Sequence, residues 1–123
     1  MKATKKVYFN RMTDEERQAI HAFLVKLEEN LADSPLSVVM FGSRARGTAA
    51  GDSDMDLLVV LPEVNATVRD KVRDLATEVL LDCGIYLSTR VWSETYRRRL
   101  AQEQSMLYQN IQREGVELLE LVN

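Results

Sequence analysis

The segment from Gly42 to Asp56 constrains this chain more than any other part of its sequence. A short apolar run ends at Gly42, small and polar residues follow, and Asp54 and Asp56 open a second apolar run. A glycine lets the backbone approach a ligand closely, and Ser43 begins a turn whose N–H groups and hydroxyl suit a phosphate. Asp54 and Asp56 stand two residues apart on a predicted strand, so both carboxylates leave the same face. This combination predicts a site for a nucleotide with Mg²⁺.

Other phosphate-binding motifs do not match this segment. Gly42 and Gly47 have the spacing of a Walker A loop, but Thr48 stands where that motif requires lysine. No G-x-G-x-x-G follows any predicted strand. A D-x-D pair by itself is more often a solvated loop that leads into a strand. Here both acids open an apolar strand at a fixed distance from a Gly-Ser turn, and this favours the metal site.

The residues around this segment predict alternating helices and strands. Thr13 and Glu16 form a capping box before a helix over 14–31. Short apolar runs predict strands over 36–41, 54–61 and 85–92, with an amphipathic helix over 66–82 between the last two. Ser93 caps a helical region that continues, with a break, to Gly115, which we expect at a C′ position. The pattern predicts one α/β domain over residues 1–123 and leaves 116–121 unassigned.

Composition excludes several classes of protein. Lys and Arg number 16 against 19 Asp and Glu, so the net charge is −3. A protein that grips nucleic acid needs a basic face, so we do not expect a nucleic-acid partner. Cys83 is the one cysteine, which agrees with a reducing cytoplasm. The longest apolar runs are too short to span a membrane, so we expect a cytoplasmic protein.

The central segment resembles a known signature. Gly42-Ser43, ten intervening residues and Asp54-Met55-Asp56 resemble the G-S-x10-D-x-D pattern of the polymerase-β-like nucleotidyltransferase superfamily. The fuller string, Gly-Ser-Arg-Ala-Arg-Gly followed by Ser-Asp-Met-Asp-Leu, is similar to the minimal nucleotidyltransferases, as is the tail from Tyr108 to Val116. The resemblance implies the nucleotidyltransferase fold, with a small mixed sheet and helices packed mainly on one face.

The same resemblance implies a function. By this resemblance we expect Gly42 and Ser43 to hold the β- and γ-phosphates of a nucleoside triphosphate, and Asp54 and Asp56 to be the catalytic carboxylates that bind Mg²⁺. An acceptor hydroxyl attacks the α-phosphate in line, and pyrophosphate leaves. Many minimal nucleotidyltransferases act beside a HEPN-domain protein as toxin–antitoxin pairs, and some adenylylate a tyrosine of that partner. The expected reaction is therefore transfer of AMP from ATP to a hydroxyl of a HEPN-type partner.

One part of the family pattern is missing. The family has a third carboxylate on a later strand, but the predicted strand over 85–92 presents Tyr86, Ser88 and Arg90 on the face of the site. Asp82 and Glu94 only flank this strand. An alternative is therefore an antitoxin of weak or no activity that keeps the fold and acts by binding its partner.

Several other residues are weaker candidates for a functional role. Arg46, and with less support Arg44, lies in the phosphate loop, where an arginine balances triphosphate charge or pairs with a nearby acid. Arg97 to Arg99 spread around a helix and predict a solvated face. His21 has no second ligand at metal spacing. An RNA-modifying transferase is a third alternative, disfavoured by the acidity, and a homo-oligomer stays open.

Overall fold

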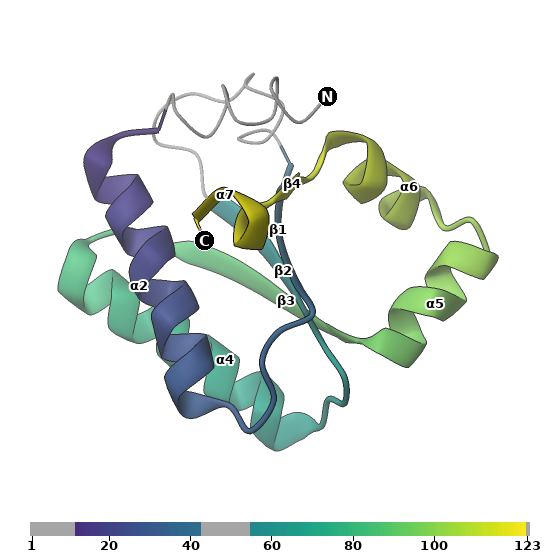
Figure 1. Cartoon of the computed structure of the whole chain (residues 1–123), viewed down its shortest axis with the longest axis horizontal. Coiled ribbons are helices and arrows are strands. Elements are labelled where there is room, and N and C mark those ends of the chain that lie inside the picture. Colours follow the sequence, from purple (N-terminus) through teal and green to yellow (C-terminus); the bar gives the residue numbers. More distant parts are fainter. Residues whose placement is uncertain (1–11, 43–54, 123) are drawn as a thin grey trace.

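The computed structural model describes residues 12–42 and 55–122 of the chain, and Figure 1 shows them as a sheet between two groups of helices. The strands are β1 (Ser37–Phe41), β2 (Met55–Leu61), β3 (Leu87–Ser93) and β4 (Val116–Glu117). The helices are α2 (Asp14–Asn30), α4 (Ala66–Cys83), α5 (Glu94–Gln102), α6 (Met106–Glu114) and α7 (Leu118–Val122). Among the described residues, no helix is long and apolar enough to cross a bilayer.

The four strands form one mixed sheet in the order β3-β2-β1-β4. β1 is antiparallel to both β2 and β4, whereas β2 and β3 are parallel and are joined through α4. Parallel neighbours need such a crossover, because a tight turn cannot return the chain to the same direction. The α/β prediction with a small mixed sheet is confirmed.

The first helix begins where its capping box predicts. The Thr13 hydroxyl accepts a hydrogen bond of 3.1 Å from the Glu16 amide, and the Glu16 carboxylate accepts one of 2.9 Å from the Thr13 amide. Both bonds satisfy donors that the first turn of a helix leaves free. One face of α2 then lies against the sheet through Ile20, Phe23 and Leu27, which are fully buried.

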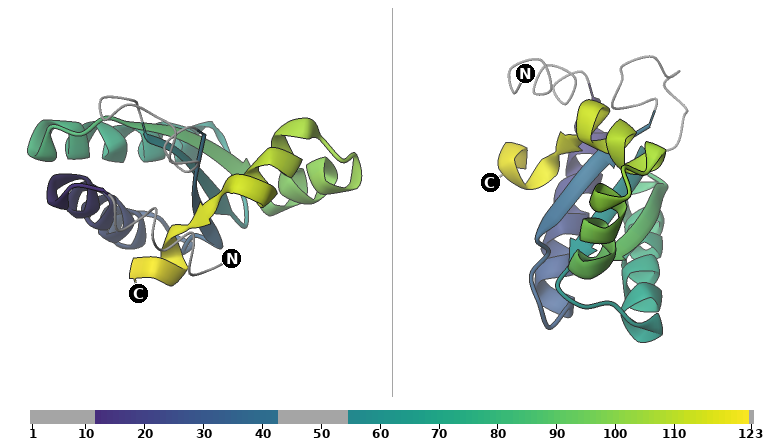
Figure 2. Two further views of the ribbon diagram at one scale, coloured as in Figure 1. Left: turned by 90° about the horizontal axis from the view of Figure 1, so that it is seen from above. Right: turned by 90° about the vertical axis from the view of Figure 1, so that its right-hand side faces the viewer.

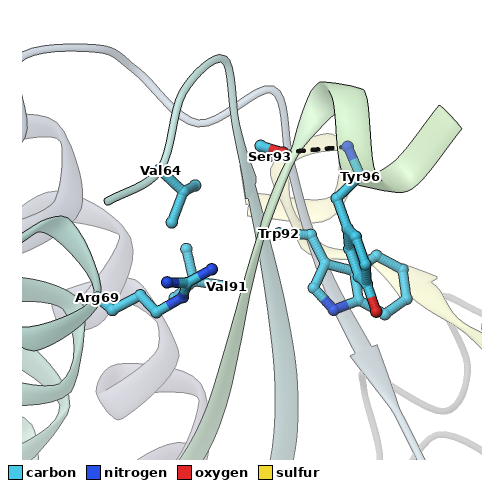
Figure 3. Close-up of a pocket in the computed structure, with 6 residues that line it drawn as sticks. All are labelled: Val64, Arg69, Val91, Trp92, Ser93 and Tyr96. Atoms are coloured by element: carbon cyan, nitrogen blue, oxygen red, sulfur yellow. Dashed lines mark hydrogen bonds between the residues drawn. The ribbon is translucent and has the colours of Figure 1, made fainter. Parts of the chain in front are cut away.

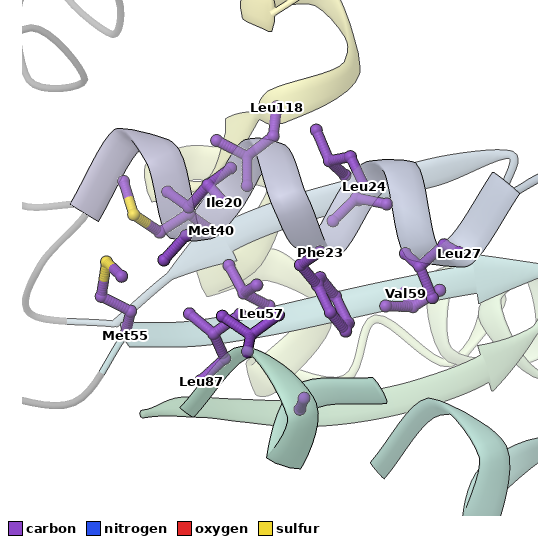
Figure 4. Close-up of a cluster of buried hydrophobic side chains, with 14 of the residues drawn as sticks. Ile20, Phe23, Leu24, Leu27, Met40, Met55, Leu57, Val59, Leu87 and Leu118 are labelled. Carbon is purple, nitrogen blue, oxygen red and sulfur yellow. The ribbon is translucent and has the colours of Figure 1, made fainter. Parts of the chain in front are cut away.

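The larger hydrophobic core lies between the sheet and the pair α2 and α4, as the close-up in Figure 4 shows. Alternate residues of β2 enter it, because successive side chains of a strand point to opposite faces. The members contributed by the strands are Val38, Met40, Met55, Leu57, Val59, Leu61, Leu87 and Val116.

The opposite face carries a smaller cluster beneath α5 and α6. It consists of Leu58 and Val60 of β2, Trp92 of β3 and Ile111 of α6. The views in Figures 1 and 2 show α2 and α4 on one side of the sheet and these two shorter helices on the other. Helices therefore pack mainly on one face, as expected, and the second face is capped only in part.

The C-terminal region adds detail that the sequence pattern did not provide. The predicted break in the helical region separates α5 from α6, and the unassigned stretch forms β4 and α7. Gly115 does not adopt the left-handed conformation of a C′ glycine, since its φ is −68°. It is instead required by space: a Cβ there would lie 2.4 Å from the Ile111 carbonyl oxygen and 2.5 Å from Cγ1 of Val39.

We expect Phe23→Ala to lower the free energy of unfolding by about 3–5 kcal/mol, because it removes a fully buried aromatic side chain and leaves a cavity. Leu81→Ala is the control, since Leu81 is 78% exposed and its truncation should change stability by less than about 0.5 kcal/mol. Urea unfolding measures both. Equal losses in the two variants would contradict the placement of α2 against the sheet.

Candidate functional site

Gly42 and Asp56 lie against each other at one end of the sheet. β1 ends at Phe41, which pairs across the sheet with Asp56 near the start of β2. Gly42 follows with a φ of +80°, a conformation that residues with a side chain rarely adopt. A Cβ at Gly42 would lie 2.6 Å from Oδ2 of Asp56, closer than any real contact. A glycine is therefore required here twice, by its backbone conformation and by the adjacent carboxylate.

The Asp56 carboxylate points away from the larger core. Its neighbours Met55 and Leu57 belong to that core, so alternation places Asp56 on the face that carries Leu58. The side chain is half-buried, and no hydrogen bond or ion pair joins it to any residue in 12–42 or 55–122. A carboxylate in this position is available to a cation that a ligand brings.

The other residues predicted for the site, Ser43, Arg46 and Asp54, lie outside the described residues, as does Arg44. Of the predicted set, the structure thus brings together Gly42, predicted for the phosphate turn, and Asp56, predicted as a metal ligand. Their contact supplies a cradle that any side chain at Gly42 would fill. This geometry fits a divalent cation with an attached phosphate, for which Asp56 provides one oxygen donor.

β3 contributes no acid to the site face. Ser88 pairs with Asp56 and Arg90 pairs with Leu58 in the parallel register. Both share the face of Asp56, because Leu87 enters the larger core and Trp92 the smaller cluster. Within the described part of the chain, no three His, Cys, Asp or Glu residues gather as metal ligands. Alternation along the sequence therefore assigned Ser88 and Arg90 to the correct face of the strand, whereas Tyr86 precedes β3.

Neither flanking acid replaces the missing carboxylate. Asp82 is on α4, on the other side of the sheet, where its carboxylate lies 3.9 Å from Nζ of Lys26. Glu94 begins α5 beyond the far end of β3 and accepts hydrogen bonds of 2.6 and 2.9 Å from Arg97 and one of 3.1 Å from Arg98. The hydrogen bonds from Arg97, with smaller contributions from Arg98, hold the pKa of Glu94 at about 2. Glu94 is therefore committed to a structural ion pair.

The three arginines of α5 make structural contacts. Arg97 and Arg98 bind Glu94, and the guanidinium of Arg99 lies 5.4 Å from the centre of the Tyr96 ring. This arrangement agrees with the predicted solvated face of α5. His21 is exposed on α2.

A pocket of about 500 Å³ lies at the opposite end of β3, as Figure 3 shows. Its lining residue on β3 nearest to Ser88 is Val91, three positions along the strand, or roughly 10 Å away. None of the described residues that line it carries a carboxylate, so it is not the metal site. Sequence reasoning missed it, because residues far apart along the chain line it: Val64, Arg69, Val91, Trp92, Ser93 and Tyr96.

Comparison with known proteins identifies the family of this chain. A family model described as "Nucleotidyltransferase domain" matches residues 20–107, which include the whole segment from Gly42 to Asp56. The chain belongs to the nucleotidyltransferase domain family. This membership confirms the resemblance seen in the central motif.

Two relatives come from Methanocaldococcus jannaschii. "Putative protein adenylyltransferase MJ1305" is 39% identical over 69 residues, which are 54% of this chain and 47% of the relative. "Putative protein adenylyltransferase MJ0604" is 31% identical over 102 residues, which are 76% of this chain and 98% of the relative. The chain thus spans about half the length of the first relative and nearly all of the second.

Solved structures share the fold. A crystal structure of a toxin–antitoxin complex with AMP-PNP superposes with a TM-score of 0.53 at 20% identity, covering 86% of this chain and 73% of that one. A mutant of the toxin–antitoxin MntA-HpeT gives 0.50 at 19% identity, covering 83% of this chain and 69% of that one. At this level of identity, the likeness establishes the nucleotidyltransferase fold alone.

We expect Gly42→Ala to weaken binding of Mg-ATP by more than about tenfold, because the new methyl group displaces the Asp56 carboxylate. Gly84→Ala is a matched control. Gly84 also has a positive φ, +74°, but nothing lies within 4 Å of an added Cβ. Both variants should lose about 1 kcal/mol of stability from backbone strain. Calorimetric titration that finds equal nucleotide affinity in the two variants would contradict the site.

Proposed function

We propose that this chain is a magnesium-dependent nucleotidyltransferase that transfers AMP from ATP to a hydroxyl of a protein partner. The observation that carries the proposal is the contact between the Gly42 backbone and the Asp56 carboxylate at the end of the sheet. Both M. jannaschii relatives are named as protein adenylyltransferases, which supports a protein acceptor and AMP as the transferred group.

Each residue has a proposed role. Gly42 and Ser43 bind the β- and γ-phosphates, Arg46 balances their charge, and Asp54 and Asp56 hold Mg²⁺ together with the triphosphate. When bound, Mg²⁺ neutralises charge on the phosphates and polarises the reacting centre. Through the Mg²⁺ that they would hold, the carboxylates also position the α-phosphate, and such positioning is a large part of catalysis in phosphoryl and nucleotidyl transfer.

The proposed partner is a HEPN-type protein, with this chain as the antitoxin of a toxin–antitoxin pair. Two solved structures with this fold are toxin–antitoxin complexes, which supports the proposal. The helices α5 and α6 are suited to part of the contact, since Met106 is 77% exposed and Leu107 and Tyr96 are also exposed. Exposed apolar residues on neighbouring helices favour a protein interface.

A second candidate function is a binding antitoxin of weak or no activity. The specific observation in its favour is Ser88, which stands opposite Asp56 on the strand where the family has an acid. With fewer carboxylates the site binds a second cation less tightly, and the acceptor hydroxyl is then poorly activated near neutral pH. Nucleotide binding does not depend on that acid, so both candidates predict binding and differ in turnover.

Replacement of both carboxylates tests the site. We expect Asp54→Asn with Asp56→Asn to abolish Mg²⁺-dependent binding of ATP, because the metal loses both protein ligands. Asp70→Asn with Asp74→Asn removes the same charge from exposed positions of α4 and should leave binding unchanged. Calorimetry with and without Mg²⁺ measures affinity, and circular dichroism checks the fold. Unchanged affinity in the first double variant would refute the site.

Restoring an acid tests turnover. We expect Ser88→Asp to raise transfer of AMP to the co-expressed product of a neighbouring gene, or to tighten Mn²⁺ binding, because the new carboxylate stands opposite Asp56. Ser93→Asp adds the same charge at the helix cap of α5, where aspartate is tolerated, and should do neither. Brisk transfer by the unmodified chain, unaffected by Ser88→Asp, would show that two carboxylates suffice.

A further inference from the structure

The order of the strands determines the side of Asp56 that faces the acceptor. β2 carries Asp56 between β1, which leads into Gly42, and β3, which carries Ser88. This inference rests on the proposed function, in which the β- and γ-phosphates lie at Gly42 and the α-phosphate at Asp56. The attacking and leaving oxygens are roughly in line at phosphorus. Because pyrophosphate leaves on the β1 side, the acceptor hydroxyl arrives from the β3 side.

β3 is open to such an approach. Within the described residues it is the last strand of the sheet, with β2 as its neighbour. Its site face presents Ser88 and Arg90 before Trp92 enters the covered cluster. The small side chain of Ser88 leaves room for an acceptor side chain to reach over the strand toward Asp56.

Arg90 supplies a positive charge on the site face of β3. Its side chain is exposed, and no hydrogen bond or ion pair joins it to another residue of the described ranges. Arg97 and Arg98, in contrast, are already bound to Glu94. Of the residues of β2 and β3, Asp56 is the acid on the same face, one strand away and diagonal to Arg90. Arg90 therefore presents a guanidinium, unpaired by any described residue, beside the path expected for the acceptor.

We propose that β3 is the docking surface for the acceptor segment of the partner, and that Arg90 binds an acidic side chain of that segment. In the transfer, the acceptor oxygen bonds to the α-phosphorus while the bond from this phosphorus to the oxygen bridging to the β-phosphate breaks. Pyrophosphate leaves with the bonding electron pair, and the acceptor proton passes to solvent. The acidic side chain that Arg90 binds then also lies near Ser88, the position at which β3 itself provides no carboxylate.

A charge-reversal experiment tests this assignment. Two fluorescent tyrosine peptides, one flanked by glutamates and one by lysines, are titrated against protein loaded with Mg²⁺ and α,β-methylene-ATP, which cannot transfer its nucleotide. We expect the wild type to bind the acidic peptide about tenfold more tightly, the effect of one charge-assisted contact. Arg90→Glu should reverse the preference, whereas Arg73→Glu, which changes an exposed arginine of α4, should retain it.

The same samples separate this inference from the proposed function. If the wild type does not bind the Mg²⁺-nucleotide, the proposed function fails and this inference with it. If nucleotide binds but the peptides bind equally, or neither binds, only the role of β3 is refuted. If Arg90→Glu lowers nucleotide affinity without changing peptide preference, Arg90 contacts the triphosphate and the assignment is wrong.

Discussion

A single charge in the central strand is the constraint on which the rest of the structure depends. Every other residue of β2 is apolar and buried, and Asp56 stands among them without a counter-ion from the described residues. Burial of an unpaired carboxylate is far too costly, so the sheet face over Asp56 stays accessible to water or a ligand cation. The helices α5 and α6 accordingly cover Leu58 and Val60 further along the strand. The unequal coverage of the two faces agrees with what this one charge requires.

Local signals explain why most elements were predictable from the sequence. Thr13 with Glu16, the helical spacing of apolar residues in α2 and α4, and the apolar runs of three strands each act over a few residues. β4 has only two residues, and it is a strand because Val39 and Met40 offer it a partner far away in the chain. Gly115 is a similar case, because its neighbour Val39 lies far away in the chain and no local sequence pattern indicates their contact. Long-range contacts, not local propensity, determine these parts.

The candidate site likewise has parts that local sequence signals predict and parts that only the three-dimensional structure determines. The prediction that Gly42 and Asp56 belong together came from their spacing, and the structure adds that a Cβ on one would strike the carboxylate of the other. Alternation also placed Ser88 and Arg90 on the site face, but only the parallel register sets Ser88 opposite Asp56. The roles toward nucleotide and metal remain predictions for Gly42, Ser43, Arg46, Asp54 and Asp56. The pocket at Arg69 and Tyr96 had no sequence signal, because α4 and α5 meet there only through the sheet.

The charge of the site face bears on both candidate functions. A third carboxylate helps to hold a second cation, but it also repels the phosphates of the nucleotide. Ser88 carries no such charge, so on the proposed function the residue that spares the nucleotide this repulsion also leaves the acceptor hydroxyl less activated. Binding and turnover are then separable in one protein. On the proposed function, a partner that brings an acid with its acceptor completes the site only in the complex, and this makes transfer conditional on assembly.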